Sequence, residues 1–292
     1  MDQASNLRKL MEKTPGMPQN KTKTIAITSG KGGVGKTNFS ASLSIALAQR
    51  GASVTLLDAD LGLANINVIF GVIPKFNLYH VIKGKKKLKD IIIQVPEGIK
   101  IIAGASGFYQ LANLDVERRN DFIKSLSDIE GDDYMIIDTG AGISHNVLSF
   151  VLPADEIIVI TTPELTAITD AYGIIKSIVA QSSEKSIKLI VNRVNSISEG
   201  NKVSQKVINI AGHFLNVKVE CIGYIFDDIS VVKSVSVQKP FIISHPKSKA
   251  SGCVGVIADR IMNLSTGGET GKSSGVSSFV KKLLAISDVK NE

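Results

Sequence analysis

The sequence has only two cysteines, and no apolar run approaches the length needed to span a lipid bilayer. Cys221 and Cys253 lie far apart and form no C-x-x-C pair, so a reduced, cytosolic protein is expected. The first residues, 1–13, carry charges throughout and lack the apolar core of a secretion signal. These absences argue against secretion and against a membrane-spanning helix.

The composition is that of a globular protein with one substantial core. Hydrophobic residues make up 43% and charged residues 21% of the 292 positions, which is ordinary for a soluble fold. The net charge of +7 favours an anionic partner surface, and charge alone does not choose between nucleic acid and anionic lipid. Five lysines fall between positions 83 and 89, although such a run is usually a solvated helix end or loop.

A glycine-rich stretch, Ser29–Thr37, lies between a strand pattern and a helix pattern. The run Thr24–Thr28 has the length and content of a buried strand, and apolar residues recur at helical spacing over Asn38–Arg50. The spacing G-x-x-x-x-G-K-[ST] of a phosphate-binding loop is met by Gly30, Gly35, Lys36 and Thr37. Glycines let backbone N–H groups approach phosphate oxygens, Lys36 can reach the β and γ phosphates, and the Thr37 hydroxyl can ligate Mg²⁺.

Strand and helix patterns alternate from Thr24 onward. Further strands are expected at Ser53–Asp58, Ile99–Ala103, Tyr134–Asp138, Glu156–Thr161, Ile187–Asn192 and Val219–Ile225. Helices are expected at Val116–Leu126, Ala167–Ala180, Lys202–Phe214 and Ala250–Met262. The alternation predicts an α/β fold, a doubly wound and mostly parallel sheet with helices on both faces. Ligands of such a sheet bind at the carboxyl ends of its strands.

Acidic residues fall at two of these strand ends. Asp58 and Asp138 end apolar strands, and Asp60 follows two residues after Asp58. These carboxylates could simply cap a turn or a helix. A nearby phosphate loop gives them a chemical purpose, because Mg²⁺ needs oxygen ligands and hydrolysis needs a group that orients water. The aspartic-protease interpretation of Asp138-Thr139-Gly140 is poor in an α/β chain with a phosphate loop.

A second lysine, Lys31, directly follows the first glycine of the loop. The stretch Gly30–Thr37 (Gly-Lys-Gly-Gly-Val-Gly-Lys-Thr) resembles the deviant phosphate loop of the MinD/ParA family of ATPases. In that family the extra lysine reaches across a dimer interface to the partner's nucleotide. The resemblance therefore implies a homodimer that closes on ATP and opens after hydrolysis, with Mg²⁺ as cofactor. The lack of close cysteine pairs argues against the superfamily members that carry iron–sulfur clusters.

The resemblance also implies roles for the acids. Asp60 would orient the attacking water, and Asp58 would shape the first switch, Asp60–Asn65, and help organise the water around the metal. Asp138 would hold Mg²⁺ through water at the end of a strand like Walker B. The implied catalytic residues are Lys31, Lys36 and Asp60, and the implied metal-site residues are Thr37, Asp58 and Asp138.

On the base side, the resemblance implies that Asn192 reads the adenine edge, whereas the plain alternative is a turn residue at a strand end. Asp228 falls in a second base-side loop, in which Phe226 stands where the family usually has proline. The implied nucleotide-binding residues are Gly30, Lys31, Gly32, Gly33, Val34, Gly35, Lys36, Thr37, Asn38, Asn192 and Asp228.

The N-terminal segment resembles one subgroup of this family. Asp2–Arg8 is similar to the D-Q-A-x-x-L-R motif of the flagellar-number ATPases known as FlhG, FleN or YlxH, in which the motif stimulates a signal-recognition-type GTPase. The implied partner residues are Asp2, Gln3, Leu7 and Arg8. Residues 14–20 contain two prolines and a glycine and are expected to be a linker, although the preceding helix could merely pack on the domain. The run Asp138–Ile143 is also similar to that subgroup.

Four segments are expected: a docking helix with linker (1–20), an ATPase domain (21–264), a flexible linker rich in Ser, Thr and Gly (265–275) and a C-terminal amphipathic helix (276–292). The apolar stripe of that helix comprises Val276, Phe279, Val280, Leu283 and Leu284. With Lys281 and Lys282 beside it, the stripe predicts a reversible anchor in an anionic membrane. The alternative is a terminal helix packed on its own domain.

The expected function is an ATP-dependent switch that hydrolyses ATP and regulates flagellar number and placement at the inner face of the cell membrane. Further implied partners are flagellar switch-complex proteins or a flagellar transcription regulator, and nucleic acid is disfavoured. Alternatives are a MinD-type regulator of the division site and a ParA-type DNA-partition ATPase, which the net charge favours weakly. An adaptor with an inactive nucleotide site is argued against by the intact Lys36, Thr37, Asp60 and Asp138.

Overall fold

The computed structural model describes residues 22–60, 65–104, 129, 131–182, 184–266 and 275–288. The N-terminal segment with Asp2, Gln3, Leu7 and Arg8, the expected helix Val116–Leu126 and residues 61–64 of the switch lie outside the described residues. Most of the expected linker 265–275 does so as well.

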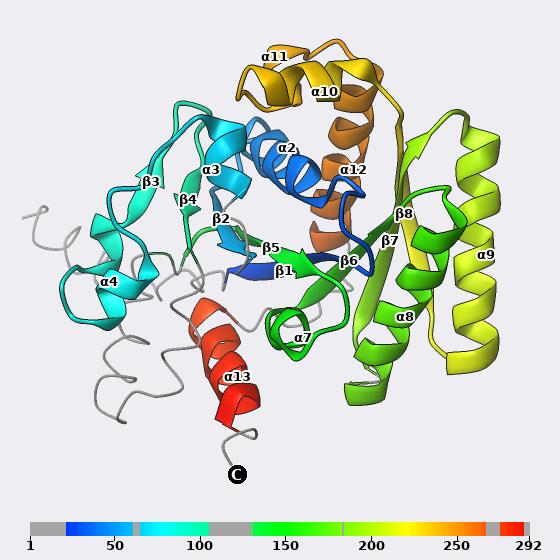
Figure 1. The fold of residues 1–292 in the computed structure, drawn as a ribbon, viewed down its shortest axis with the longest axis horizontal. Coiled ribbons are helices and arrows are strands. Elements are labelled where there is room, and N and C mark those ends of the chain that lie inside the picture. Colours follow the sequence, from blue (N-terminus) through cyan, green and yellow to red (C-terminus); the bar gives the residue numbers. More distant parts are fainter. Residues whose placement is uncertain are drawn as a thin grey trace, which may run out of the picture.

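An eight-stranded sheet forms the middle layer, in the order β3-β4-β2-β5-β1-β6-β7-β8 (Figure 1). Its strands are β1 (Lys23–Ser29), β2 (Val54–Ala59), β3 (Ile92–Gln94), β4 (Lys100–Ile102), β5 (Tyr134–Ala141), β6 (Glu156–Thr161), β7 (Ser186–Val194) and β8 (Val219–Phe226). Among the described strands, β3 alone is antiparallel, pairing with β4 at one edge. The predicted α/β fold with a mostly parallel sheet is confirmed.

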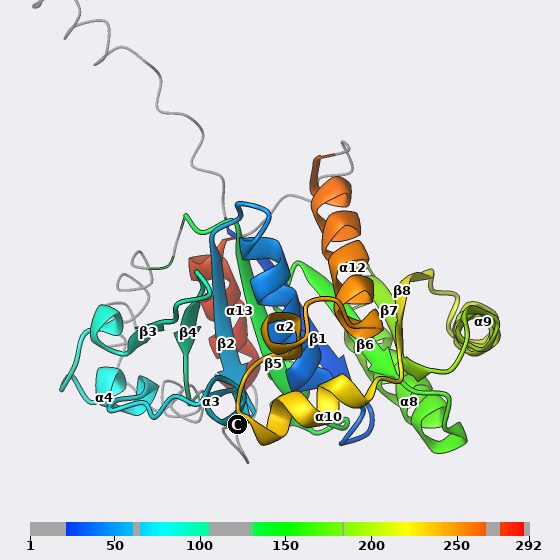
Figure 2. The ribbon, with the colours of Figure 1, turned by 90° about the horizontal axis from the view of Figure 1, so that it is seen from above.

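Helices cover both faces of the sheet. They are α2 (Lys36–Ala48), α3 (Asn65–Phe70), α4 (Leu78–Ile82), α7 (His145–Val151), α8 (Leu165–Gln181), α9 (Ile197–Leu215), α10 (Ile229–Ser236), α11 (Phe241–Ser244), α12 (Lys249–Thr266) and α13 (Val276–Asp288), with the 3-10 turn η1 at Leu88–Asp90. Helices α2 and α12 pack on one face, and α7, α8 and α13 pack on the other (Figure 2). The inner strands β1, β2, β5 and β6 are buried on both sides, which explains why they read as continuous apolar runs.

Several element boundaries differ from the sequence prediction. Helix α9 begins at Ile197 rather than Lys202, because the Ser196 hydroxyl accepts a hydrogen bond from the Glu199 N–H (3.1 Å) and starts the helix earlier. The spacing S-x-x-E is a helix-start signal that the apolar periodicity did not include. Helix α12 continues to Thr266, two residues into the expected linker. The short elements β3, α3, α4, α7, α10 and α11 were not predicted.

The C-terminal helix α13 is part of the hydrophobic core. The five residues of its apolar stripe are each at most 2% exposed, and the helix packs against α7 and β1. The predicted membrane stripe is therefore internal in this conformation, as in the alternative of a terminal helix packed on its own domain. Burying one such side chain contributes about 1.5–3 kcal/mol, so exposing all five would cost on the order of 10 kcal/mol. None of the described helices is long and apolar enough to cross a bilayer.

Candidate nucleotide-binding site

The glycine-rich loop joins the end of β1 to the start of α2 at the carboxyl edge of the sheet. Gly33 (φ 79°) and Gly35 (φ 93°) adopt the left-handed conformation, which glycine takes without strain. At Gly30 a Cβ would lie 2.0 Å from the backbone oxygen of Asp170. The loop thus has the backbone shape that the glycine spacing predicts. It leads directly into the N-terminus of α2, and backbone N–H groups at such a position bind anions.

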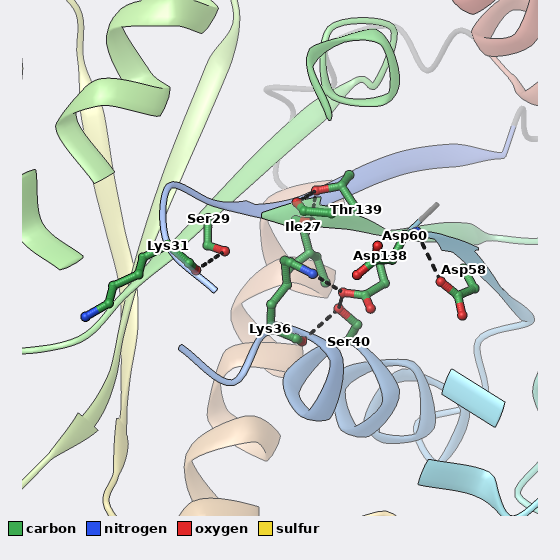
Figure 3. A network of polar contacts seen from close by, with 10 residues as sticks. Ile27, Ser29, Lys31, Lys36, Ser40, Asp58, Asp60, Asp138 and Thr139 are labelled. Atoms are coloured by element: carbon green, nitrogen blue, oxygen red, sulfur yellow. Dashed lines mark hydrogen bonds and ion pairs between the residues drawn. The ribbon is translucent and has the colours of Figure 1, made fainter. Parts of the chain in front are cut away.

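Lys36 and Asp138 lie together at the centre of the site (Figure 3). Lys36 Nζ is 3.3 Å from Asp138 Oδ1, and the Ser40 hydroxyl donates to the same oxygen at 2.9 Å. Lys36 is 7% exposed and Asp138 is fully buried. Ser40 was not predicted, although it lies one helical turn after Lys36, whose carbonyl oxygen, 3.0 Å away, is a second acceptor for the same hydroxyl proton.

Asp58 and Asp138 are side by side, because β2 and β5 are neighbours and the two residues are partners in their register. Both are fully buried, and Asp58 Oδ2 and Asp138 Oδ2 have no hydrogen-bond partner among the described residues. Two buried carboxylate oxygens without donors suit a cation. No cluster of three or more metal-ligating side chains is found in the described part of the chain, but Mg²⁺ characteristically uses one or two carboxylates together with phosphates and water.

The carboxyl group of Asp58 has its pKa near neutral pH. Burial raises the pKa of Asp58 to about 7, and the negative charge of Asp138 adds to the rise. The backbone N–H of Asp60 donates to Asp58 Oδ1 at 3.1 Å and acts in the opposite direction. A cation placed between the two acids would favour the charged form of Asp58.

The other two predicted residues on this side lie next to the pair. Asp60 follows β2, and its Oδ1 would lie 3.8 Å from a Cβ built on Gly140, at the end of β5. Thr37 is half-buried in the first turn of α2. The predicted catalytic and metal-site residues therefore gather at one place, with the exception of Lys31.

Lys31 points away from Lys36 (Figure 3). Lys31 Nζ is 2.6 Å from Glu164 Oε2, and it donates to the Thr166 hydroxyl at 2.9 Å. Both partners belong to the start of α8, where Glu164 is the N-cap residue. The contact with Lys31 lowers the pKa of Glu164. Neither partner was predicted from the sequence.

A cavity of about 300 Å³ opens on the other side of the loop. The predicted base-side residues Asn38, Asn192 and Asp228 line it, together with Gly35 and Phe226. Asn38 Oδ1 is buried and has no hydrogen-bond partner among the described residues, which suits a ligand with donor groups. The cavity adjoins the loop at Gly35, so a nucleotide whose phosphates bind the loop could place its base in this cavity.

Asn192 connects the end of β7 to the loop. Its amide Nδ2 donates to the Val34 carbonyl at 2.7 Å, and its Oδ1 accepts from the Arg193 N–H at 2.9 Å. A Cβ on Gly35 would lie only 2.4 Å from Asn192 Nδ2. The amide is thus fixed in orientation at the cavity wall, with one N–H and one lone pair remaining for a ligand.

The second base-side loop has a structural task of its own. Asp228 caps α10, since its Oδ1 accepts from the Ser230 N–H (2.9 Å) and its Oδ2 accepts from the Ala250 N–H (3.3 Å). Burial opposes the effect, but these N–H groups hold the pKa of Asp228 below its ordinary value. Lys249 Nζ lies 5.9 Å from the centre of the Phe226 ring, a cation–π distance.

A phosphate loop and paired acids at the carboxyl edge of a parallel sheet, with a cavity beside them, define a nucleotide-binding protein of the P-loop type. Residues 25–241 match the CobQ/CobB/MinD/ParA nucleotide binding domain. The antiactivator FleN of Pseudomonas aeruginosa is 39% identical over 238 residues, which are 81% of this chain and 85% of FleN. The flagellum site-determining protein YlxH of Helicobacter pylori is 36% identical over 290 residues, or 97% of this chain and 98% of YlxH.

Among solved structures, the septum site-determining protein MinD of Pyrococcus horikoshii, complexed with Mg-ADP, matches with a TM-score of 0.66 at 28% identity. The match covers 84% of this chain and 97% of the MinD chain. The chain belongs to the MinD/ParA family of nucleotide-binding proteins, as the resemblance of its loop predicts.

Proposed function

We propose that this protein is an ATP-dependent, dimerising switch that hydrolyses ATP and regulates the number and placement of flagella at the cell membrane. The observation that carries the proposal is the separation of the two loop lysines. Lys36 faces the buried acids, whereas Lys31 lies on the outside of the same loop and contacts the start of α8. Relatives named for flagellar roles, matched over most of their length, support the flagellar part.

The nucleotide would be ATP with Mg²⁺. Lys36 and the loop N–H groups would hold the phosphates, and Asn192 would hold the base in the adjoining cavity. Thr37, Asp58 and Asp138 would hold Mg²⁺, directly or through water, and the ion would neutralise phosphate charge. Asp60 would orient the attacking water. The Mg-ADP of the Pyrococcus horikoshii relative supports this assignment.

Dimerisation would complete the site. Lys31 lies on the far side of the loop from the Lys36–Asp138 pair, so we propose that it serves the nucleotide of a second copy. Before dimerisation, Glu164 neutralises its charge. Hydrolysis would then remove the phosphate charge that Lys31 binds and release the dimer.

The partners are proposed on the same basis. Residues 1–20, with Asp2, Gln3, Leu7 and Arg8, would dock on a signal-recognition-type GTPase, and flagellar switch-complex proteins or a transcription regulator would read the ATP state. Helix α13 would leave the core in the ATP dimer and anchor the protein to anionic lipid. Two copies on one dimer would gain by effective concentration, which helps to offset the cost of exposing the stripe.

Light scattering of the Asp60→Ala variant tests the switch. We expect a stable dimer with ATP and Mg²⁺ and a monomer with ADP, because the variant binds ATP but does not orient water. The Lys31→Ala variant should remain monomeric with ATP while still binding it. A wild-type protein that stays monomeric at high concentrations of protein and ATP would contradict the proposal.

The flagellar role and the GTPase partner need separate measurements. In cells lacking the protein, flagellar number should change, and wild-type protein but not Lys36→Ala should restore it. A peptide of residues 1–20 should accelerate GTP turnover by the partner GTPase. An unchanged rate with a correctly folded GTPase would remove this partner from the proposal and leave the ATP switch intact.

A further inference from the structure

Most of the excess positive charge of the chain is concentrated in one segment. Residues 75–90 contain six lysines and one aspartate, a net charge of +5 within a chain whose net charge is +7. The segment includes α4 and η1 and lies beyond β3 and β4, at the opposite end of the sheet from α9 (Figures 1 and 2). We call residues 73–90 the basic edge. None of the nucleotide-site residues belongs to it.

Five lysines of the basic edge are exposed and have no ionic partner among the residues that the structure describes. The exposed ones are Lys75, Lys83, Lys85, Lys87 and Lys89. Within the described residues, no carboxylate forms an ion pair with any of them. Asp90, the single acid of the segment, is already engaged as a cap, since its Oδ2 accepts the Lys87 N–H at 2.9 Å.

The turn that carries these lysines is ordered by its own contacts. The N–H groups of Lys85 and Lys86 both donate to the His80 carbonyl, at 2.9 and 3.2 Å. Lys86 Nζ lies 4.0 Å from the centre of the Phe76 ring, and Lys83 Nζ lies 5.7 Å from that of Tyr79. The cationic side chains are therefore presented from a defined surface rather than from a loose tail.

Apolar side chains are also exposed within the basic edge. Ile73 is 92% exposed, and Tyr79 is 38% exposed beside Lys83. The membrane interface accommodates both kinds of group, because phosphate headgroups attract lysine and the acyl boundary accepts aliphatic and aromatic side chains. A duplex also offers phosphates, but it buries an isoleucine only where the side chain enters a groove or wedges between base steps. The basic edge also lacks arginine, the residue that most often reads bases.

We infer that the basic edge is a lipid-contact surface for anionic membranes, separate from helix α13. Clusters of four to eight basic residues are typical of surfaces that bind anionic headgroups. The apolar stripe of α13 is buried in this conformation, whereas the basic edge is exposed in it. It can therefore bind a membrane while α13 is docked, in ADP as well as in ATP.

Vesicle sedimentation of the full-length protein in ADP tests this inference. The probe is vesicles of phosphatidylglycerol and phosphatidylcholine, with pure phosphatidylcholine vesicles for comparison. The test variant is Lys85→Gln/Lys87→Gln/Lys89→Gln. The matched control is Lys202→Gln/Lys206→Gln/Lys218→Gln, which removes the same charge from exposed positions in or after α9, at the other sheet edge. Circular dichroism checks the folding of each variant.

The basic-edge variant should bind anionic vesicles on the order of a hundredfold more weakly, since each of the three lysines near such a surface contributes about fivefold. The α9 control should bind like wild type, and Ile73→Ser should weaken binding without altering the net charge. Equal losses in both triple variants would show a diffuse charge effect and overturn the inference. The inference would also be overturned if the wild-type protein bound DNA duplex but not vesicles, and if only the basic-edge variant lost DNA binding.

Discussion

The phosphate loop and helix α13 lie in one domain but are held in different ways. The loop depends on shape, because Gly33 and Gly35 take left-handed φ values and Gly30 passes against the backbone of Asp170. Helix α13 depends on burial, because its five apolar side chains fill the space against α7 and β1. Substitutions in the loop should therefore act through clashes and strain, and substitutions in α13 through cavities.

The largest expected effect is on α13. Phe279→Ala should lower the free energy of unfolding by about 3–5 kcal/mol, since it removes a fully buried ring and leaves a cavity. Urea denaturation measures the change. The control Lys281→Ala alters an exposed position of the same helix and should shift the value by less than about 0.5 kcal/mol. If Phe279→Ala were as stable as wild type, α13 would be a free tail rather than part of the core.

The next effect concerns the loop. Gly35→Ala should destabilise the protein by about 1–3 kcal/mol, because φ is 93° and the new Cβ would meet Asn192 Nδ2 at 2.4 Å. Nucleotide binding should be lost with it, as a fluorescent ATP analogue would show. Gly32→Ala, where a Cβ meets nothing within 4 Å, is the control for stability.

A second substitution separates clash from strain at this glycine. In the Gly35→Ala/Asn192→Ala double variant the clash is removed but the left-handed φ remains. Part of the stability should therefore return. Additive losses in the double variant would mean that the clash with Asn192 contributes nothing.

The third effect is electrostatic and concerns Asp58. Its pKa is about 7 in the folded protein and about 4 in an unfolded chain, so the folded state holds the extra proton between these values. Stability contributed by this group therefore falls as the pH rises from about 4 to 7. Asp58→Asn should raise stability at pH 7.5 by on the order of 1–2 kcal/mol, without Mg²⁺ or nucleotide, and by much less at pH 4. A gain independent of pH would show that Asp58 is not the titrating group.

The nucleotide site could be predicted further than the rest because its motif encodes local backbone geometry. Gly30, Gly35 and Lys36 are fixed by their spacing, and Asp58 and Asp138 by their positions at neighbouring strand ends. An amphipathic stripe such as that of α13 indicates that one face of the helix is covered. It does not indicate whether the cover is the protein's own core or a membrane. Its burial against α7 and β1 depends on the tertiary fold.

Single contacts between residues far apart in the chain could not be predicted from the sequence either. Glu164 lies 133 residues after Lys31, and no pattern links the two. Ser40 reads as an ordinary helix residue until the fold brings Asp138 to it. The start of α9 was within reach, because Ser196 and Glu199 form a recognised helix-start signal.

The smallest expected effect concerns the contact of Lys31 with Glu164, and it sharpens the comparison by testing a polar contact at the surface of the loop. In the proposed dimer Lys31 must leave Glu164 Oε2 and the Thr166 hydroxyl to reach the partner's nucleotide. Glu164→Gln removes the competing negative charge and should strengthen ATP-dependent dimerisation. Exposed ion pairs contribute little, so the protein concentration at half-dimerisation should fall only a few-fold.

Light scattering over a concentration series with ATP and Mg²⁺ measures this midpoint concentration. Thr166→Val keeps the charge of Glu164 and should shift the midpoint less, whereas Lys31→Ala should abolish the dimer. Weaker dimerisation of Glu164→Gln would mean that Glu164 supports the dimer instead of competing with the nucleotide for Lys31.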